Sequence, residues 1–135
     1  MARIASFDCE VEQEEKAGER LRGSRLGGPD GAAWNWQGPL ICWLEIRADC
    51  AGKLSGEVQF GKLLAPLPPV ELRASEAARI RVTFSDRAWM RAAGPGDPQK
   101  GYAEVAIRAR AQVQCASGAS LDLADQFAGR FAWGE

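Results

Sequence analysis

The sequence contains no histidine, and this absence excludes several kinds of catalytic and metal site. Without an imidazole the chain cannot build a Ser-His-Asp or Cys-His catalytic arrangement, a histidine-ligated zinc site or a haem held by a proximal histidine. No stretch approaches the roughly 18 consecutive apolar residues of a membrane-spanning helix. The opening MARIASFDCEVEQEE also lacks the apolar core of a secretion signal. We therefore expect a cytoplasmic protein that does not enter a membrane.

No CxxC motif links the cysteines, which are Cys9, Cys42, Cys50 and Cys115. In a chain without a secretion signal we expect reduced thiols. Cys9, Cys42 and Cys115 fall on the apolar side of alternating segments, so we expect them to pack as small hydrophobic residues. Cys50 lies in the turn sequence DCAGK and should be the most exposed. For Cys50 the alternatives are a reactive thiol or a disulfide with Cys42.

The charges are nearly balanced, with 17 Lys and Arg against 18 Asp and Glu. The arginines are scattered rather than clustered, so neither nucleic acid nor an anionic membrane is an expected partner. Carboxylates concentrate in the N-terminal DCEVEQEE. The glycine-rich RLRGSRLGGPDG lacks the GxxxxGK[ST] pattern of a phosphate-binding loop, and no calcium-binding DxD run occurs. We expect no metal and no cofactor.

Apolar and polar residues alternate along most of the chain, which is the pattern of strands with one buried side. The clearest case is YAEVAIRARAQVQCAS, where Val105, Ile107 and Val113 share one side and Arg108 and Arg110 share the other. Turn-forming sequences rich in Gly, Pro, Asp and Ser separate the alternating segments. The strands are expected within 5–12, 40–47, 55–64, 70–74, 79–85, 102–117, 120–125 and 126–134.

These segments predict an all-β fold, a two-sheet antiparallel β-sandwich of about eight strands, with a closed β-barrel as the alternative. One short helix is expected near 86–93, with Ser85 or Asp86 as its N-cap and Gly94 as its stop. Trp89 and Met90 of this helix should cover one end of the sheets. We expect residues 1–135 to form a single β-sandwich domain, with a polar loop at about 13–33.

Four arginines are predicted to point outward from two strands, Arg79 and Arg81 from one and Arg108 and Arg110 from the other. If the two strands are neighbours, the guanidinium groups form a ladder that needs acidic side chains between them. A solvated face and a contact surface for an acidic partner are the alternatives.

Three tryptophans, Trp34, Trp36 and Trp43, lie close together in GAAWNWQGPLICWLE. Trp34 and Trp36 precede the Gly-Pro break at 38–39, so their orientation is not fixed by the pattern. Trp43 lies within a strand but on the side opposite Cys42 and Leu44, so it should point outward. Three explanations are open. The 13–33 loop or the 86–93 helix covers Trp43, it anchors another protein, or it stacks on a flat ligand.

No catalytic constellation emerges from these residues, so we do not expect an enzyme. The sequence predicts a non-catalytic intracellular binding module or accessory subunit that recognises a partner protein through an exposed sheet face. The alternative is a carbohydrate- or small-ligand-binding β-sandwich that uses Trp34, Trp36 and Trp43. A tryptophan-bearing sandwich of this size is similar in outline to carbohydrate-binding modules, which implies a glycan ligand through architecture alone. The expected contact residues are Trp34, Trp36, Trp43, Arg79, Arg81, Arg108 and Arg110.

Overall fold

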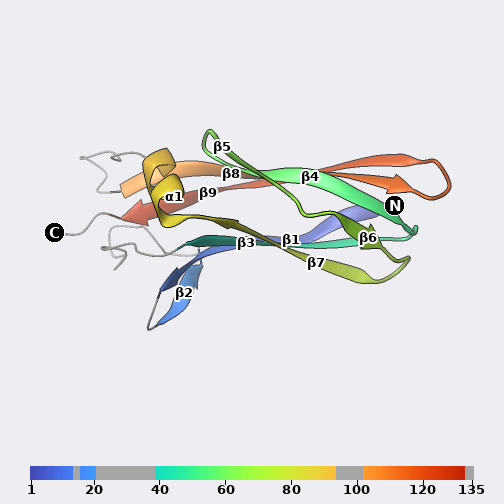
Figure 1. Cartoon of the computed structure of the whole chain (residues 1–135), viewed down its shortest axis with the longest axis horizontal. Coiled ribbons are helices and arrows are strands. Elements are labelled where there is room, and N and C mark those ends of the chain that lie inside the picture. Colours follow the sequence, from blue (N-terminus) through green and yellow to red (C-terminus); the bar gives the residue numbers. More distant parts are fainter. Residues whose placement is uncertain (14–15, 21–38, 94–101, 133–135) are drawn as a thin grey trace.

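The computed structural model describes residues 1–13, 16–20, 39–93 and 102–132. Its strands form two antiparallel sheets that pack face to face, and Figure 1 shows both sheets from one edge. The predicted all-β sandwich is confirmed, because the described strands form two separate sheets rather than a closed barrel.

Sheet A has the strand order β2-β1-β3-β7. Its strands are β1 (Ala2–Gln13), β2 (Lys16–Arg20), β3 (Leu40–Ala48) and β7 (Ala77–Phe84). Strand β2 lies inside the segment that we expected to be a polar loop. The remainder of that segment, 14–15 and 21–33, falls outside the described residues.

Sheet B has the order β5-β4-β8-β9, and β6 also pairs with β4. Its strands are β4 (Gly52–Phe60), β5 (Leu63–Pro66), β6 (Val70–Leu72), β8 (Tyr102–Cys115) and β9 (Ser120–Ala132). The predicted strand at 55–64 is divided by a tight turn at Gly61, which has a φ of 59°. The predicted strands at 120–125 and 126–134 form one strand, β9, which ends at Ala132 in the described chain.

The inward side chains of the two sheets form one apolar core, as the period-two pattern predicted. Along β3 the inward residues Cys42, Leu44 and Ile46 are buried, and along β8 the same holds for Ile107 and Val113. Strand β1 needs a bulge to keep this pattern. Ile4 pairs with Ile46 and Ser6 with Glu45, so Ala5 has no partner in β3. The extra residue lets both Ile4 and Phe7 pack on the core.

Helix α1 (Asp86–Ala93) closes one end of the sandwich, on the left in Figure 1. The hydroxyl of Ser85 accepts a hydrogen bond from the Ala88 N–H at 3.3 Å, which confirms Ser85 as the N-cap. Trp89 is completely buried, and its ring meets Phe60 edge-on at a centroid distance of 6.3 Å. The predicted covering role of the helix is therefore confirmed through Trp89. No helix among the described residues is long and apolar enough to cross a membrane.

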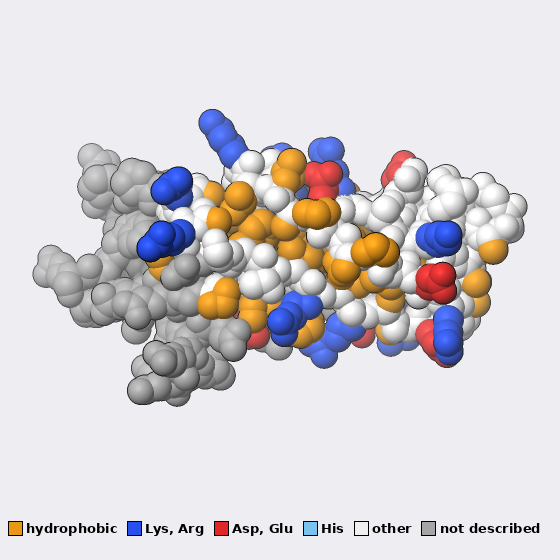
Figure 2. Space-filling view, viewed as in Figure 1, with side chains coloured by type: hydrophobic (Ala, Val, Ile, Leu, Met, Phe, Trp, Pro, Cys, Tyr) orange, Lys and Arg blue, Asp and Glu red, His pale blue; other side chains and the backbone are white. Residues whose placement is uncertain are grey.

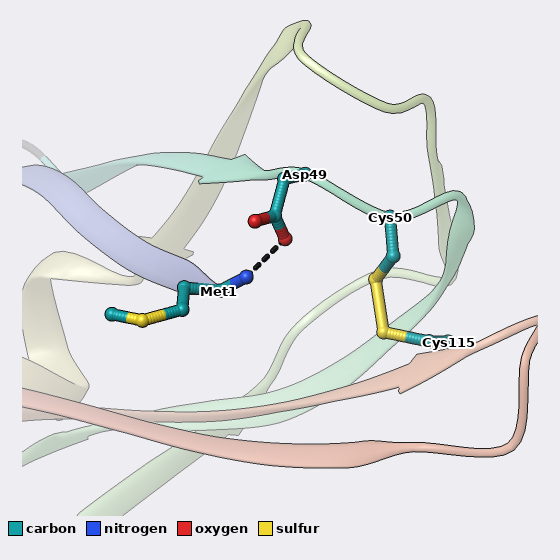
Figure 3. A network of polar contacts seen from close by, with 4 residues as sticks. All are labelled: Met1, Asp49, Cys50 and Cys115. Atoms are coloured by element: carbon teal, nitrogen blue, oxygen red, sulfur yellow. Dashed lines mark hydrogen bonds and ion pairs between the residues drawn. A yellow bond between two sulfur atoms is a disulfide. The ribbon is translucent and has the colours of Figure 1, made fainter.

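The opposite end of the sandwich is held by a cluster of covalent and polar contacts (Figure 3). Here the chain passes from β3 in sheet A to β4 in sheet B, and Cys50 in this turn forms a disulfide with Cys115 at the end of β8. The N-terminal ammonium of Met1 donates a hydrogen bond to the Asp49 carboxylate. This hydrogen bond lowers the pKa of Asp49 from its ordinary value of 3.8.

Candidate functional site

Trp43 lies in the middle of the outer face of sheet A. Its strand β3 runs between β1 and β7, and Trp43 pairs with Asp8 on one side and with Arg81 on the other. The side chain is half-buried, while Cys42 and Leu44 on either side of it in sequence face the core. The prediction that Trp43 points away from the core is consistent with this register.

Two arginines of β7 cover the Trp43 ring. The guanidinium carbon of Arg79 lies 4.9 Å from the ring centroid, and that of Arg81 lies 5.8 Å from it. Both distances are within the range of cation–π attraction, which is worth about 0.5–1 kcal/mol at an exposed site. Helix α1 is not the cover considered for Trp43, because it places its own tryptophan in the core at one end of the sandwich. Most of the 13–33 loop, the other cover considered, lies outside the described residues.

Acidic side chains border Trp43 on the side away from the arginines. Asp8 and Glu10 are outward residues of β1, and the sheet register places Asp8 directly opposite Trp43. Together with Ser6 and Arg79 they line a hollow of about 150 Å³ beside the indole. We call the set Ser6, Asp8, Glu10, Trp43, Arg79 and Arg81 the Trp43 face. Its charge changes from acidic over β1 to basic over β7.

Asp8 and Glu10 were not among the predicted contact residues. The signal that could have found them is the alternation of carboxylates in DCEVEQEE, which places Asp8 and Glu10 on the same side of a strand. The sequence does not state which strand lies beside β3, so their approach to Trp43 follows only from the sheet order.

Arg108 and Arg110 lie on the other outer face of the molecule. Their strand β8 belongs to sheet B, whereas β7 with Arg79 and Arg81 belongs to sheet A. Outward side chains of the two sheets of a sandwich point in opposite directions, so the conditional ladder of four arginines does not form. The five predicted contact residues that the structure describes therefore belong to two separate surfaces.

The outer face of sheet B is hollowed beside its arginines. One hollow of about 390 Å³ is lined by the outward residues Arg108, Arg110, Ala124 and Gln126. A second hollow of about 540 Å³ shares Arg110 and Ala124 with the first. The described residues that line the two hollows include no aromatic side chain.

The predicted contact residues Trp34 and Trp36 lie outside the described residues. The structure therefore brings together three of the seven predicted contact residues, Trp43, Arg79 and Arg81, and places Arg108 and Arg110 elsewhere.

The expectation of reduced cysteines is wrong, because all four cysteines form disulfides. Cys9 and Cys42 occupy directly opposite positions of β1 and β3, with their Cα atoms 4.0 Å apart. Cys50 pairs with Cys115 rather than with Cys42, so it has no free thiol. Cys9, Cys42 and Cys115 are buried in the core as predicted, but as disulfide sulfurs.

The chain was compared with known proteins at three levels. No protein-family model, no curated protein sequence and no solved structure matches it.

Proposed function

We propose that this chain is a non-catalytic binding module or accessory subunit that recognises a partner protein through the Trp43 face. The observation that carries the proposal is the half-exposed Trp43 ring with Arg79 and Arg81 held over it on an outward sheet surface. Tryptophan and arginine are the side chains most enriched among the residues that dominate binding energy at protein interfaces. Arginines that already rest on an aromatic ring also lose less conformational freedom when a partner orders them.

The carbohydrate alternative has weaker support. A sugar ring binds tryptophan by stacking on the open face of the indole, and here Arg79 and Arg81 occupy positions over that ring. The sandwich architecture by itself does not favour a glycan over any other partner.

The compartment of the protein stays a prediction. The expected cytoplasmic location rested on the sequence of the N-terminal segment. The two disulfides weigh against it, since disulfides persist mainly in oxidising compartments.

The proposal can be tested by cross-linking and affinity capture from native lysate with three forms of the protein. Trp43→Ala should lose the partner that the wild-type chain retains. The double variant Arg108→Ala/Arg110→Ala, which alters the other outer face, should keep it. Urea unfolding of each variant must show a folded protein. Equal capture by Trp43→Ala and the wild type would contradict the proposal.

A further inference from the structure

We propose that strand β7 is a docking edge, to which a partner adds an extended strand of alternating acidic and apolar residues. This inference rests on the proposed function and specifies the chemistry of the partner. Strand β7 is the last strand of sheet A, so one side of its backbone has no neighbouring strand in the described chain. Recognition of this kind uses main-chain hydrogen bonds for affinity and alternate side chains for specificity.

The other described edges carry a proline, an inward charge, a bulge or too few residues for strand addition, and β7 carries none of these four. In sheet B, the edge strand β9 has an inward carboxylate, that of Asp125. Strand β5 ends at Pro66, and β6 has only three residues. In sheet A, β1 is bulged and β2 is short. Strand β7 pairs with β3 over eight consecutive positions without a register shift, and it contains no proline and no inward charge. Natural sheets use such features to block edge pairing.

The register identifies which backbone groups of β7 face the free edge. Antiparallel pairs alternate between a wide hydrogen-bonded form and a narrow form with Cα atoms about 4.5 Å apart. Cys9 and Cys42, at 4.0 Å, are a narrow pair, so the N–H and C=O of Cys42 point toward β7 and bond Val82. The alternating neighbours Arg81 and Thr83 therefore turn their N–H and C=O groups to the free edge. Outside the strand ladders, neither residue makes a backbone hydrogen bond to another described residue.

Side chains around this edge set the pattern of the incoming strand. The inward residues of β7 are apolar, and β5 and β6 lie beside β7 across the open edge of the sandwich. Figure 2 shows apolar side chains gathered on this side of the molecule. Leu64 of the neighbouring strand β5 is 55% exposed. One row of side chains on an added strand would pack against these groups, and it should be apolar. The other row would lie beside Arg79 and Arg81 on the outer face.

The two arginines favour an acidic strand over a second copy of this chain. If two copies of the chain paired through β7 in an antiparallel register that used most of the strand, Arg81 of one copy would lie opposite an arginine of the other. Like charges placed directly opposite each other are destabilising. A strand with Asp or Glu at alternate positions would instead place a carboxylate opposite each arginine. Glu45 lies opposite Arg79 within sheet A, so Arg81 is the stronger attraction for an added carboxylate.

The test uses the intact protein and a labelled synthetic peptide with glutamate and valine at alternate positions, beside a matched peptide with lysine in place of glutamate. Fluorescence anisotropy at low salt should show binding of the glutamate peptide alone. Amide hydrogen exchange should slow at Arg79, Arg81 and Thr83 when that peptide is present. Arg79→Gln/Arg81→Gln should weaken binding about tenfold, as expected for two cross-strand charge pairs.

A matched pair of variants separates backbone pairing from a general surface effect. Thr83→Pro removes one edge N–H, while Thr83→Ala keeps it, and proline is tolerated on the solvent side of an edge strand. We expect Thr83→Pro to lose the peptide and Thr83→Ala to retain it. The inference is overturned if neither peptide binds, or if both peptides bind equally. It is also overturned if the two Thr83 variants bind the peptide equally, or if the chain self-associates and Thr83→Pro abolishes that association. If Trp43→Ala still weakens partner capture in those cases, the inference fails while the proposed function stands.

Discussion

The guanidinium of Arg79 on β7 lies 4.9 Å from the centre of the Trp43 ring on β3, so an aromatic side chain that points out of the core is covered by its own sheet. This pairing predicts that Trp43 contributes little to folding. We expect Trp43→Ala to lower the free energy of unfolding by about 1–2 kcal/mol, the loss of a half-buried ring and two exposed cation–π contacts. Urea-induced unfolding followed by circular dichroism measures the difference.

Trp89 gives the matched control for this measurement, since it is the same residue type in complete burial against Phe60. Trp89→Ala should cost about 3–5 kcal/mol because it leaves a cavity in the core. If Trp43→Ala proves as destabilising as Trp89→Ala, Trp43 is a folding residue and the proposed partner surface loses its main support.

The disulfides give a second prediction. Each closes a long loop, with sequence separations of 33 for Cys9–Cys42 and 65 for Cys50–Cys115. By the chain-entropy argument, removing either one should lower the free energy of unfolding by about 4 kcal/mol. The double variants Cys9→Ala/Cys42→Ala and Cys50→Ala/Cys115→Ala, compared with the wild type in urea, measure each loss.

Alkylation of the unfolded protein without reductant checks the pairing itself. No cysteine should react before reduction, and all four should react after it. If Cys50 and Cys115 were labelled in the unreduced protein while Cys9 and Cys42 were protected, the Cys50–Cys115 disulfide would be contradicted and the Cys9–Cys42 disulfide would stand.

The strands and the helix were predictable because they depend on local pattern. Alternation of Val105 and Ile107 with Arg108 marks β8 without any knowledge of its neighbours, and Ser85 marks the start of α1 in the same way. Relationships between strands were not predictable. Whether Arg79 and Arg108 share a face depends on the assignment of β7 and β8 to sheets, which the period-two pattern does not encode.

The disulfide pairing of the cysteines was not predictable from the sequence for the same physical reason. A disulfide needs Cα atoms within about 7 Å, and that distance follows from strand register. Cys9 and Cys42 lie opposite each other in the register that β1 and β3 adopt after the bulge at Ala5, which differs by one residue from the register before it. The local sequence around Ala5 does not predict that bulge. The prediction of reduced thiols followed instead from the expected cytoplasmic location.

Gly56 supplies a third prediction, because strands β4 and β8 approach too closely there for any side chain. A Cβ atom at Gly56 would lie 2.1 Å from the carbonyl oxygen of Arg110, and its φ of 154° disfavours other residues. We expect Gly56→Ala to lower the free energy of unfolding by about 2–4 kcal/mol through collision and backbone strain.

Gly118 separates these two causes. It also has a positive φ, of 100°, but a Cβ added there meets nothing within 4 Å. Gly118→Ala should therefore show the backbone strain alone, about 1–2 kcal/mol. Equal losses in the two variants by urea unfolding would mean that β4 and β8 can separate at Gly56 without cost.

The contact between Met1 and Asp49 predicts a small dependence of stability on pH. The hydrogen bond from the N-terminal ammonium lowers the pKa of Asp49 below 3.8, so the folded state binds this proton less readily than the unfolded state. The stabilisation is present above pH 3.8 and is lost as the pH falls through the lowered pKa. Asp49→Asn should therefore be less stable than the wild type at neutral pH and should approach it in acid.

Urea midpoints recorded from neutral pH down into this acid range measure the effect, with Asp122→Asn as a control for the loss of one exposed carboxylate. A difference between Asp49→Asn and the wild type that stays constant or grows in acid would show that the ammonium does not stabilise the folded state through this carboxylate. The exposed position of the pair limits the expected difference to a small one.

Asp125 yields the last prediction, which concerns association rather than stability. It pairs with the core residue Ala109, so it faces inward from the edge strand β9 between Leu123 and Phe127. An inward carboxylate on an edge strand opposes the addition of another strand, because that addition would bury the charge. Asp125→Val should keep the fold and associate at lower protein concentration than the wild type in analytical ultracentrifugation. Asp122→Val makes the same chemical change on the outward side of β9 and should not, so equal association of the two variants would assign the effect to added surface hydrophobicity alone.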